Sequence, residues 1–138
     1  MTGDDMSALD ILESFLQAYR RRDVEIIRSL CKSDITYISV EGLVAEGIEE
    51  FMLLIQKEFD SFSIAYEPLS WQKSHEKASE CLISWKRGVQ FVRNAALRRV
   101  ELLGTALIVK SKETWSIAHL QYSVPVSFRT LFRKTKTE

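Results

Sequence analysis

The sequence predicts an α+β fold, and the order of two periodicities along the chain carries that prediction. Apolar residues recur at helical spacing between Ser7 and Phe59, whereas beyond Asp60 they alternate with a period of two. The final alternating run starts at Trp115 and is stopped by Pro125, which cannot donate a hydrogen bond to a sheet. Helices followed by an antiparallel meander are typical of an α+β domain.

We expect three helices before the meander. The first spans about residues 7–21 and has Ser7 as its N-cap, and the second is short and follows Asp23. The third begins at Gly47, because the following apolar residues fall on one helical face. These are Ile48, Phe51, Met52, Ile55 and Phe59.

The strands are expected between and after these helices. A first strand, Asp34 to Val40, is rich in β-branched and aromatic residues and ends at a Glu41-Gly42 turn. The later strands are expected near residues 62–73, 78–92, 97–110 and 114–124. Within the run from Val100 to Val109 both alternating faces are largely apolar. Helices can cover only one face, so we expect a second copy of the chain to cover the other.

Length and charge limit the function. The 138 residues (15.9 kDa) predict one domain over 1–138, with a core of about 6–125 and a C-terminal extension of 126–138. Basic and acidic residues balance at 19 each, which argues against nucleic acid or an anionic membrane as partner. No apolar stretch approaches the roughly 20 residues that span a bilayer, and we expect a soluble, cytoplasmic protein. Cys31 and Cys81 are expected to be free thiols.

Several short signals, in this order, resemble the nuclear transport factor 2 (NTF2)-like superfamily, in particular its SnoaL-like and calmodulin-kinase association-domain branches. The signals are Phe15 to Asp23, Ile27 to Leu30, Asp34 to Tyr37, Glu41-Gly42, Glu46-Gly47, and the ending with Trp115, Ile117, His119, Ser123 and Pro125. The resemblance implies a cystatin-like cone, in which three N-terminal helices pack on a strongly curved, mostly antiparallel sheet. It also implies an apolar pocket inside the cone and a homodimer formed through the convex sheet face.

The resemblance further implies which side chains line that pocket. They are Phe15, Tyr19, Tyr37, Ser39, Trp85, Leu120 and Tyr122. An aromatic cavity with a few hydroxyls is typical of a site for a small apolar or aromatic ligand, although the same side chains can simply fill the core. We expect no cofactor and no metal, because no nucleophile motif, phosphate loop or metal-ligand spacing occurs in the sequence.

The sequence argues against steroid-isomerase chemistry. The resemblance to such enzymes implies an aromatic hydroxyl on the first helix and a carboxylate on the first strand, and these positions hold Phe15 and Ser39. We expect His75 to face solvent and His119 to be a structural or interface residue. Residues two apart on a strand face the same side, so we expect His119 to share a face with Ile117. The resemblance implies that the opposite face, with Ala118, Leu120 and Tyr122, points toward the pocket.

Three functional hypotheses remain open at this point. The leading one is a small-molecule-binding or sensory module, a role that the resemblance supports because such domains occur in bacterial signalling proteins. The second is a cyclase, dehydratase or isomerase-type enzyme whose acid-base groups are not evident from the sequence. The third is an association domain that serves to dimerise, suggested by the Trp115 to Pro125 ending shared with kinase hubs.

Overall fold

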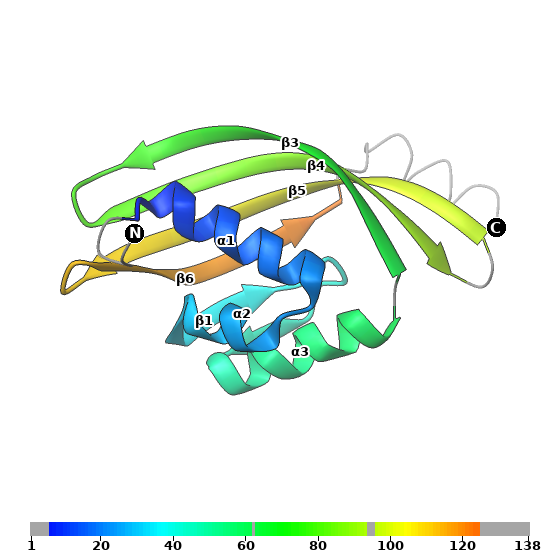
Figure 1. Ribbon diagram of the computed structural model, residues 1–138, viewed down its shortest axis with the longest axis horizontal. Helices are drawn as coiled ribbons and strands as arrows, with labels where there is room; N and C mark the ends of the chain where they lie inside the picture. The colour runs from blue at the N-terminus through cyan, green and yellow to red at the C-terminus, as the bar shows by residue number, and fades with distance from the viewer. Residues whose placement is uncertain (1–5, 62, 94–95, 125–138) are drawn as a thin grey trace.

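A long, bent sheet and three helices make up the described part of the chain, which in this computed structural model is residues 6–61, 63–93 and 96–124. The elements are α1 (Ala8–Arg21), α2 (Val24–Ser29), β1 (Cys31–Ile38), β2 (Val44–Glu46), α3 (Ile48–Ser61), β3 (Ser63–Glu76), β4 (Glu80–Arg93), β5 (Ala96–Ser111) and β6 (Thr114–Ser123). Figure 1 shows α1 lying across the sheet, with α2 and α3 beside β1. The predicted α+β order is confirmed.

The sheet joins a meander to the first strand of the chain. Its order is β2-β1-β6-β5-β4-β3, and the strands from β3 to β6 pair antiparallel in sequence order. β1 pairs parallel with β6, for example Tyr37 with Leu120. Neither this parallel pairing nor the three-residue strand β2 was predicted, because a periodic pattern shows that a segment is a strand but not which strand it pairs with.

Both ends of α1 are fixed by side chains. The Ser7 Oγ accepts from the Asp10 N–H at 3.1 Å while the Asp10 carboxylate accepts from the Ser7 N–H at 3.0 Å, which confirms Ser7 as the cap. At the other end Arg22 has a left-handed backbone (φ 59°). Its guanidinium donates to the Phe59 carbonyl at 2.9 Å and lies over the Phe59 ring. The Arg22 side chain therefore ties the end of α1 to the end of α3.

The first strand begins and ends earlier than predicted. It runs over Cys31–Ile38 instead of Asp34 to Val40. Ser39 leaves the strand because its hydroxyl accepts from the Leu43 N–H at 3.1 Å, and its own N–H donates to the Leu43 carbonyl at 2.9 Å. Gly42 takes a positive φ of 84° inside this turn.

The core lies between the helices and one face of the sheet, which we call the inner face. α1 packs on β5 and β6, and α3 packs on β1 and β2. Helices and strands both contribute fully buried side chains, among them Leu12, Phe15, Ile27, Ile35, Tyr37, Phe51, Ile55, Ile83, Ile108, Ile117 and Leu120. Burial of this apolar area is the main force that stabilises the fold.

A bulge in β6 changes the predicted facing of its residues. Leu107 pairs with His119 but Ile108 pairs with Ile117, so Ala118 is an extra residue without a partner in β5. Ile117 consequently points into the core with Leu120, and the prediction that Ile117 and His119 share a face is wrong. His119 is half-buried beside Leu107 on the opposite, outer face of the sheet.

The central strand β5 has the two apolar faces that the sequence predicts. Gly104, Ala106 and Ile108 are buried on the inner face, while Leu103 and Leu107 lie half-buried on the outer face.

No helix in the described part of the chain is long and apolar enough to cross a bilayer. The predicted C-terminal extension, 126–138, lies outside the described residues.

Candidate functional site

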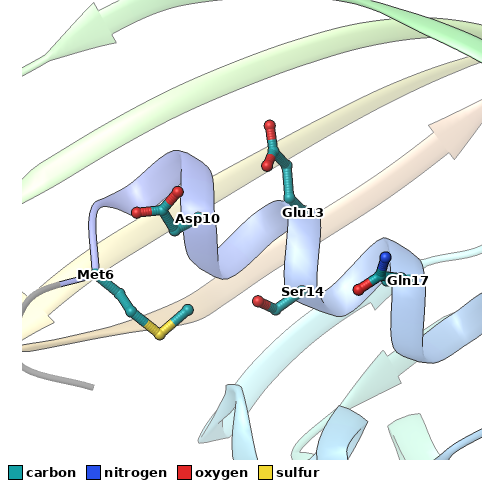
Figure 2. A pocket seen from close by; sticks show the side chains of 5 residues that line it. All are labelled: Met6, Asp10, Glu13, Ser14 and Gln17. Carbon is teal, nitrogen blue, oxygen red and sulfur yellow. The ribbon is translucent and has the colours of Figure 1, made fainter. Parts of the chain in front are cut away.

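The first cavity to consider runs along α1. It has a volume of about 370 Å³, and Figure 2 shows the side chains that line it, Met6, Asp10, Glu13, Ser14 and Gln17. The Asp10 carboxylate is already used by the cap of α1. The polar groups here come from a single solvated helix face, and we assign this groove no role.

A cluster of three polar side chains lies at the other end of α1, and we call it the glutamate–tyrosine cluster: Tyr19, Tyr37 and Glu58. The Tyr19 hydroxyl donates to one oxygen of the Glu58 carboxylate at 2.6 Å, and the Tyr37 hydroxyl donates to the other oxygen at 2.7 Å. The three residues come from α1, β1 and α3. The cluster therefore joins three elements through one partly buried carboxylate.

Aromatic packing holds the two tyrosine rings in place. Tyr37 is fully buried and meets Phe51 edge-on, with ring centroids 5.0 Å apart. Tyr19 makes a similar edge contact with Phe59 at 5.0 Å. Since both rings are fixed, the two hydroxyls are oriented toward Glu58 before any ligand arrives.

The environment changes the acidity of two members of the cluster. Burial raises the pKa of Glu58 above its ordinary value, a change that the nearby charge of Glu41 reinforces and the two tyrosine hydrogen bonds oppose. Burial, followed by the charge of Glu58, raises the pKa of Tyr37 well above its ordinary value. Tyr37 therefore remains a protonated hydrogen-bond donor at any physiological pH.

A cavity of about 160 Å³ opens beside the carboxylate, and we call it the Glu58 cavity. It is lined by Ser39, Glu41, Leu43, Leu54, Lys57 and Glu58. Leucine side chains supply an apolar wall, and the charged side chains supply two carboxylates and one ammonium group. The cavity therefore combines a small apolar surface, partly exposed at Leu43, with several polar groups, a mixture that also occurs in small-molecule sites.

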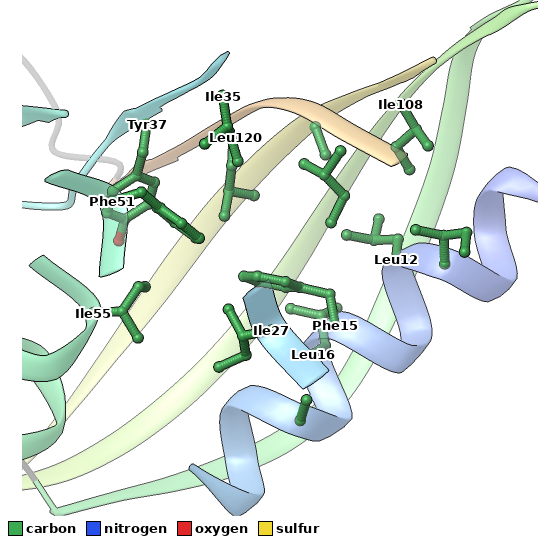
Figure 3. Packing of buried hydrophobic residues seen from close by; sticks show 14 of the residues in the cluster. Leu12, Phe15, Leu16, Ile27, Ile35, Tyr37, Phe51, Ile55, Ile108 and Leu120 are labelled. Carbon is green, nitrogen blue, oxygen red and sulfur yellow. The ribbon is translucent and has the colours of Figure 1, made fainter. Parts of the chain in front are cut away.

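The structure brings most of the predicted pocket residues into one chain of aromatic contacts. Successive ring centroids lie 5.0 to 6.4 Å apart along Tyr19, Phe15, Phe51, Tyr37, Tyr122 and Trp85. Figure 3 shows Phe15, Tyr37 and Leu120 among the packed side chains of the core. Phe15 and Leu120 have no exposed surface and act as packing. Ser39 lines the Glu58 cavity instead, although its hydroxyl also holds the turn at Leu43.

Trp85 depends on a glycine for its position. It pairs with Gly104, and a Cβ on Gly104 would overlap the Trp85 indole. The indole thus covers Gly104 and reaches Tyr122, the partner of Gly104 in the next strand, at 5.7 Å between centroids. Trp85 also lines a separate cavity of about 210 Å³ between β3, β4 and β5.

Glu58 was not predicted as a site residue, yet a signal for it is present in the sequence. It follows Phe51 by seven positions and Ile55 by three, so it falls on the apolar face of α3. A carboxylate on a buried, apolar helix face needs hydrogen-bond donors, because burial removes it from water. Here the donors are two tyrosine hydroxyls that are distant in sequence. Among the described residues, no three His, Cys, Asp or Glu side chains are grouped to hold a metal ion.

Comparison with solved structures shows which proteins have the same fold. A ketosteroid isomerase-like protein from Erwinia carotovora atroseptica SCRI1043 is 16% identical with a TM-score of 0.73, covering 85% of this chain and 92% of that one. An NTF2-like protein of unknown function from Pseudomonas putida KT2440 is 17% identical with a TM-score of 0.69, covering 87% and 85%. The CaMKII hub of S. rosetta is 18% identical with a TM-score of 0.67, covering 85% and 93%. At these identities the likeness establishes the fold alone.

Family membership rests on a closer match. No curated protein matches the chain. A model of the SnoaL-like domain, however, matches residues 8–127, which is nearly the whole of the described structure. The resemblance predicted from the short sequence signals is confirmed. The chain belongs to the SnoaL-like domain family, within the NTF2-like superfamily, and has a cystatin-like fold.

Proposed function

We propose that this protein is a small-molecule-binding module and that its ligand occupies the Glu58 cavity. The observation that carries the proposal is the partly buried Glu58 carboxylate, which two tyrosine hydroxyls hold at the wall of a cavity of about 160 Å³. A cavity of about 150 Å³ is large enough to bind benzene in another protein. Tyr19 and Tyr37 hold the carboxylate of this site and Ser39 lines it, while Phe15, Trp85, Leu120 and Tyr122 belong to the packed core.

The energetic cost of the cluster supports a functional role. Withdrawing a carboxylate from water costs free energy that hydrogen bonds only partly return, and an apolar residue at position 58 would fill the same helix face without that cost. The rest of this face of α3, at Phe51, Met52, Ile55 and Phe59, is apolar and buried. A ligand that uses the carboxylate explains why the chain carries an acid there.

Two neighbouring leucines provide a matched test. Leu54 lines the Glu58 cavity, whereas Leu53 is 65% exposed on the outside of α3. A fragment library is screened by ligand-observed NMR against the wild type, Leu54→Trp and Leu53→Trp. We expect hits that bind the wild type and Leu53→Trp and are lost in Leu54→Trp, which fills the cavity. Hits that bind all three proteins alike, or a wild type that binds nothing, would contradict the proposal.

A second candidate function is acid-base catalysis in the same cavity. Burial raises the pKa of Glu58 above its ordinary value, and a carboxyl with a raised pKa is suited to general acid-base work. We expect no steroid-type isomerisation, because Phe15 has no hydroxyl and the Ser39 hydroxyl accepts from the Leu43 N–H. Turnover of an unsaturated steroid ketone by the wild type, abolished in Glu58→Gln, would reverse that expectation and favour an enzyme.

Self-association through the outer sheet face is also part of the proposal. Leu82 and Leu107 are paired neighbours on that face, Leu103 and Val109 lie on the same face of β5, and all four are half-buried in the single chain. His119 lies beside Leu107. We expect a homodimer in light scattering on a size-exclusion column, and we expect Leu107→Lys to shift it to monomer. A wild type that elutes as a monomer at micromolar concentration would refute the dimer.

The two cysteines bear on where the protein is located. Cys31 and Cys81 are free thiols, and burial raises the pKa of Cys31 to about 12, so it stays a neutral thiol. Free thiols suit the reducing cytoplasm. We therefore propose a cytoplasmic protein in which residues 1–138 form one domain.

A further inference from the structure

We propose that the ligand of the Glu58 cavity is a small organic cation whose ammonium group donates hydrogen bonds to the Glu58 carboxylate. This inference rests on the proposed function and names the chemical class of the ligand. Three features of the cavity carry it: the unused acceptor capacity of Glu58, the charge of the wall, and the size of the apolar surface.

The first feature is the hydrogen bonding of Glu58. A carboxylate accepts about four hydrogen bonds, two on each oxygen. Tyr19 supplies one donor to the first oxygen and Tyr37 supplies one donor to the second. The carboxylate therefore keeps one accepting site on each oxygen, and it lines the cavity. An ammonium group has three donors and no acceptor, so it fits these sites.

The second feature is charge. Glu58 and Glu41 contribute two negative charges to the wall of the cavity, and Lys57 contributes one positive charge. Of the tyrosines that face Glu58, Tyr37 on β1 stays neutral because burial raises its pKa, and the Tyr19 hydroxyl on α1 donates a hydrogen bond to Glu58. With Glu58 ionised, the wall therefore carries a net charge of about −1. A monovalent cation balances this charge, whereas an anion would meet two carboxylates.

The third feature is size. Leu43 and Leu54 face the same space of about 160 Å³. That volume admits roughly five water molecules, or one hydrocarbon group about as large as a five- or six-membered ring. A cation that carries a small ring thus fills the apolar part of the cavity while its ammonium group meets Glu58. The tyrosines hold the carboxylate in position beforehand, so less ordering is needed on binding.

The inference is tested with two probes of equal shape, cyclopentylammonium and the neutral cyclopentanol. Their affinities are measured by NMR chemical-shift titration with the wild type, with Glu58→Gln, and with Glu13→Gln as a control that removes an exposed acid on α1. We expect the cation to bind the wild type and Glu13→Gln equally and to bind Glu58→Gln about tenfold more weakly or worse. The alcohol is expected to bind all three proteins weakly and alike. Because glutamine keeps the shape of Glu58 and can still bond both tyrosines, the variant is expected to fold, which its thermal unfolding checks.

The outcomes separate this inference from the proposed function. If the alcohol binds the wild type as tightly as the cation, and both are lost in Leu54→Trp, the cavity is a ligand site but the cation assignment is wrong. If neither probe binds, the cation assignment is also wrong, and the fragment screen alone then decides the proposed function. A pH series adds an independent check, since protonation of Glu58 removes its charge. The affinity for the cation is expected to fall as the pH is lowered through the raised pKa of Glu58, and to stay level in Glu58→Gln.

Discussion

The core of this protein has an aliphatic part and an aromatic part, and the two differ in what they bury. In the aliphatic part, Leu12 of α1 packs with Ile108 and Ile117 of the paired strands β5 and β6, and none of these side chains has exposed surface. In the aromatic part, ring contacts surround the glutamate–tyrosine cluster and a cavity lies beside it. The first part only excludes water, whereas the second keeps a carboxylate and an unfilled space.

The two parts are expected to contribute differently to the stability of the fold. A close-packed aliphatic core gains free energy from every buried methylene group. The aromatic part gives up some of that gain by holding a charge that burial disfavours, as the raised pKa of Glu58 indicates. Substitutions in the two parts are therefore expected to differ in the size and even in the sign of their effect on stability.

The largest effect is expected in the aliphatic part. Leu12→Ala removes a fully buried side chain and leaves a cavity, which should lower the free energy of unfolding by about 2 to 5 kcal/mol. Urea denaturation followed by circular dichroism measures this change. A loss below about 1 kcal/mol would mean that α1 does not pack on the sheet as described.

A smaller loss is expected where the aromatic part meets the sheet. Gly104→Ala places a Cβ against the Trp85 indole, and overpacking of this kind costs about 1 to 3 kcal/mol. The displaced indole should also change its fluorescence spectrum. Gly42→Ala serves as a contrast, because no atom lies within 4 Å of its Cβ and only its positive φ is strained. An unchanged Trp85 environment in Gly104→Ala would show that the two residues are not in contact.

The cluster itself is expected to give an effect of opposite sign. Because the pKa of Glu58 is raised in the folded protein, the folded protein binds a proton at Glu58 more readily than the unfolded chain does. The stability that this proton contributes is fully present below pH 4.5, the ordinary pKa of a glutamate, and is lost as the pH rises through the folded pKa. The glutamine of Glu58→Gln does not ionise, so the variant does not lose stability in this way. The free energy of unfolding of the variant relative to the wild type should therefore increase as the pH rises from 4 to 8, as measured by urea denaturation across that range. A difference that does not vary with pH would place Glu58 in solvent.

The smallest effect is expected on the surface. Arg28 pairs with Glu49 at 2.7 Å, but both side chains are largely exposed. Arg28→Ala should leave the urea midpoint almost unchanged, and the small loss should shrink further at high salt. A larger loss would mean that this pair holds α2 against α3 more firmly than an exposed ion pair usually does.

The aliphatic part was largely predictable from the sequence and the aromatic part was not. The periodicities at Leu12, Leu16 and Ile55 locate the helices and their buried faces, because burial depends on local spacing. The sequence also groups Tyr19 with Tyr37 through a family resemblance. Glu58 was not predicted as a site residue because its hydrogen-bond partners are 39 and 21 residues away in the sequence. A local pattern does not indicate contacts over such separations.

The wrong prediction of which sheet face Ile117 occupies in β6 also arises from a feature that a local pattern does not show. A single extra residue, Ala118, reverses the facing of every position before it, so strict alternation fails for Ile117 although it holds for Leu120 and Tyr122. The turn at Ser39 likewise depends on a side-chain hydrogen bond that no periodicity contains. Patterns along the chain therefore predicted every helix and strand except β2, while the candidate site depends on contacts between these elements.

The most direct test of the account is a crystal structure of the protein soaked with cyclopentylammonium. We predict that the ring lies against Leu54 in the Glu58 cavity and that the ammonium nitrogen is about 2.7 to 2.9 Å from a Glu58 oxygen, with both tyrosine hydrogen bonds retained. A cavity that holds only water at saturating cation, or a cation bound elsewhere on the molecule, would contradict the claim that the aromatic part of the core is the binding site.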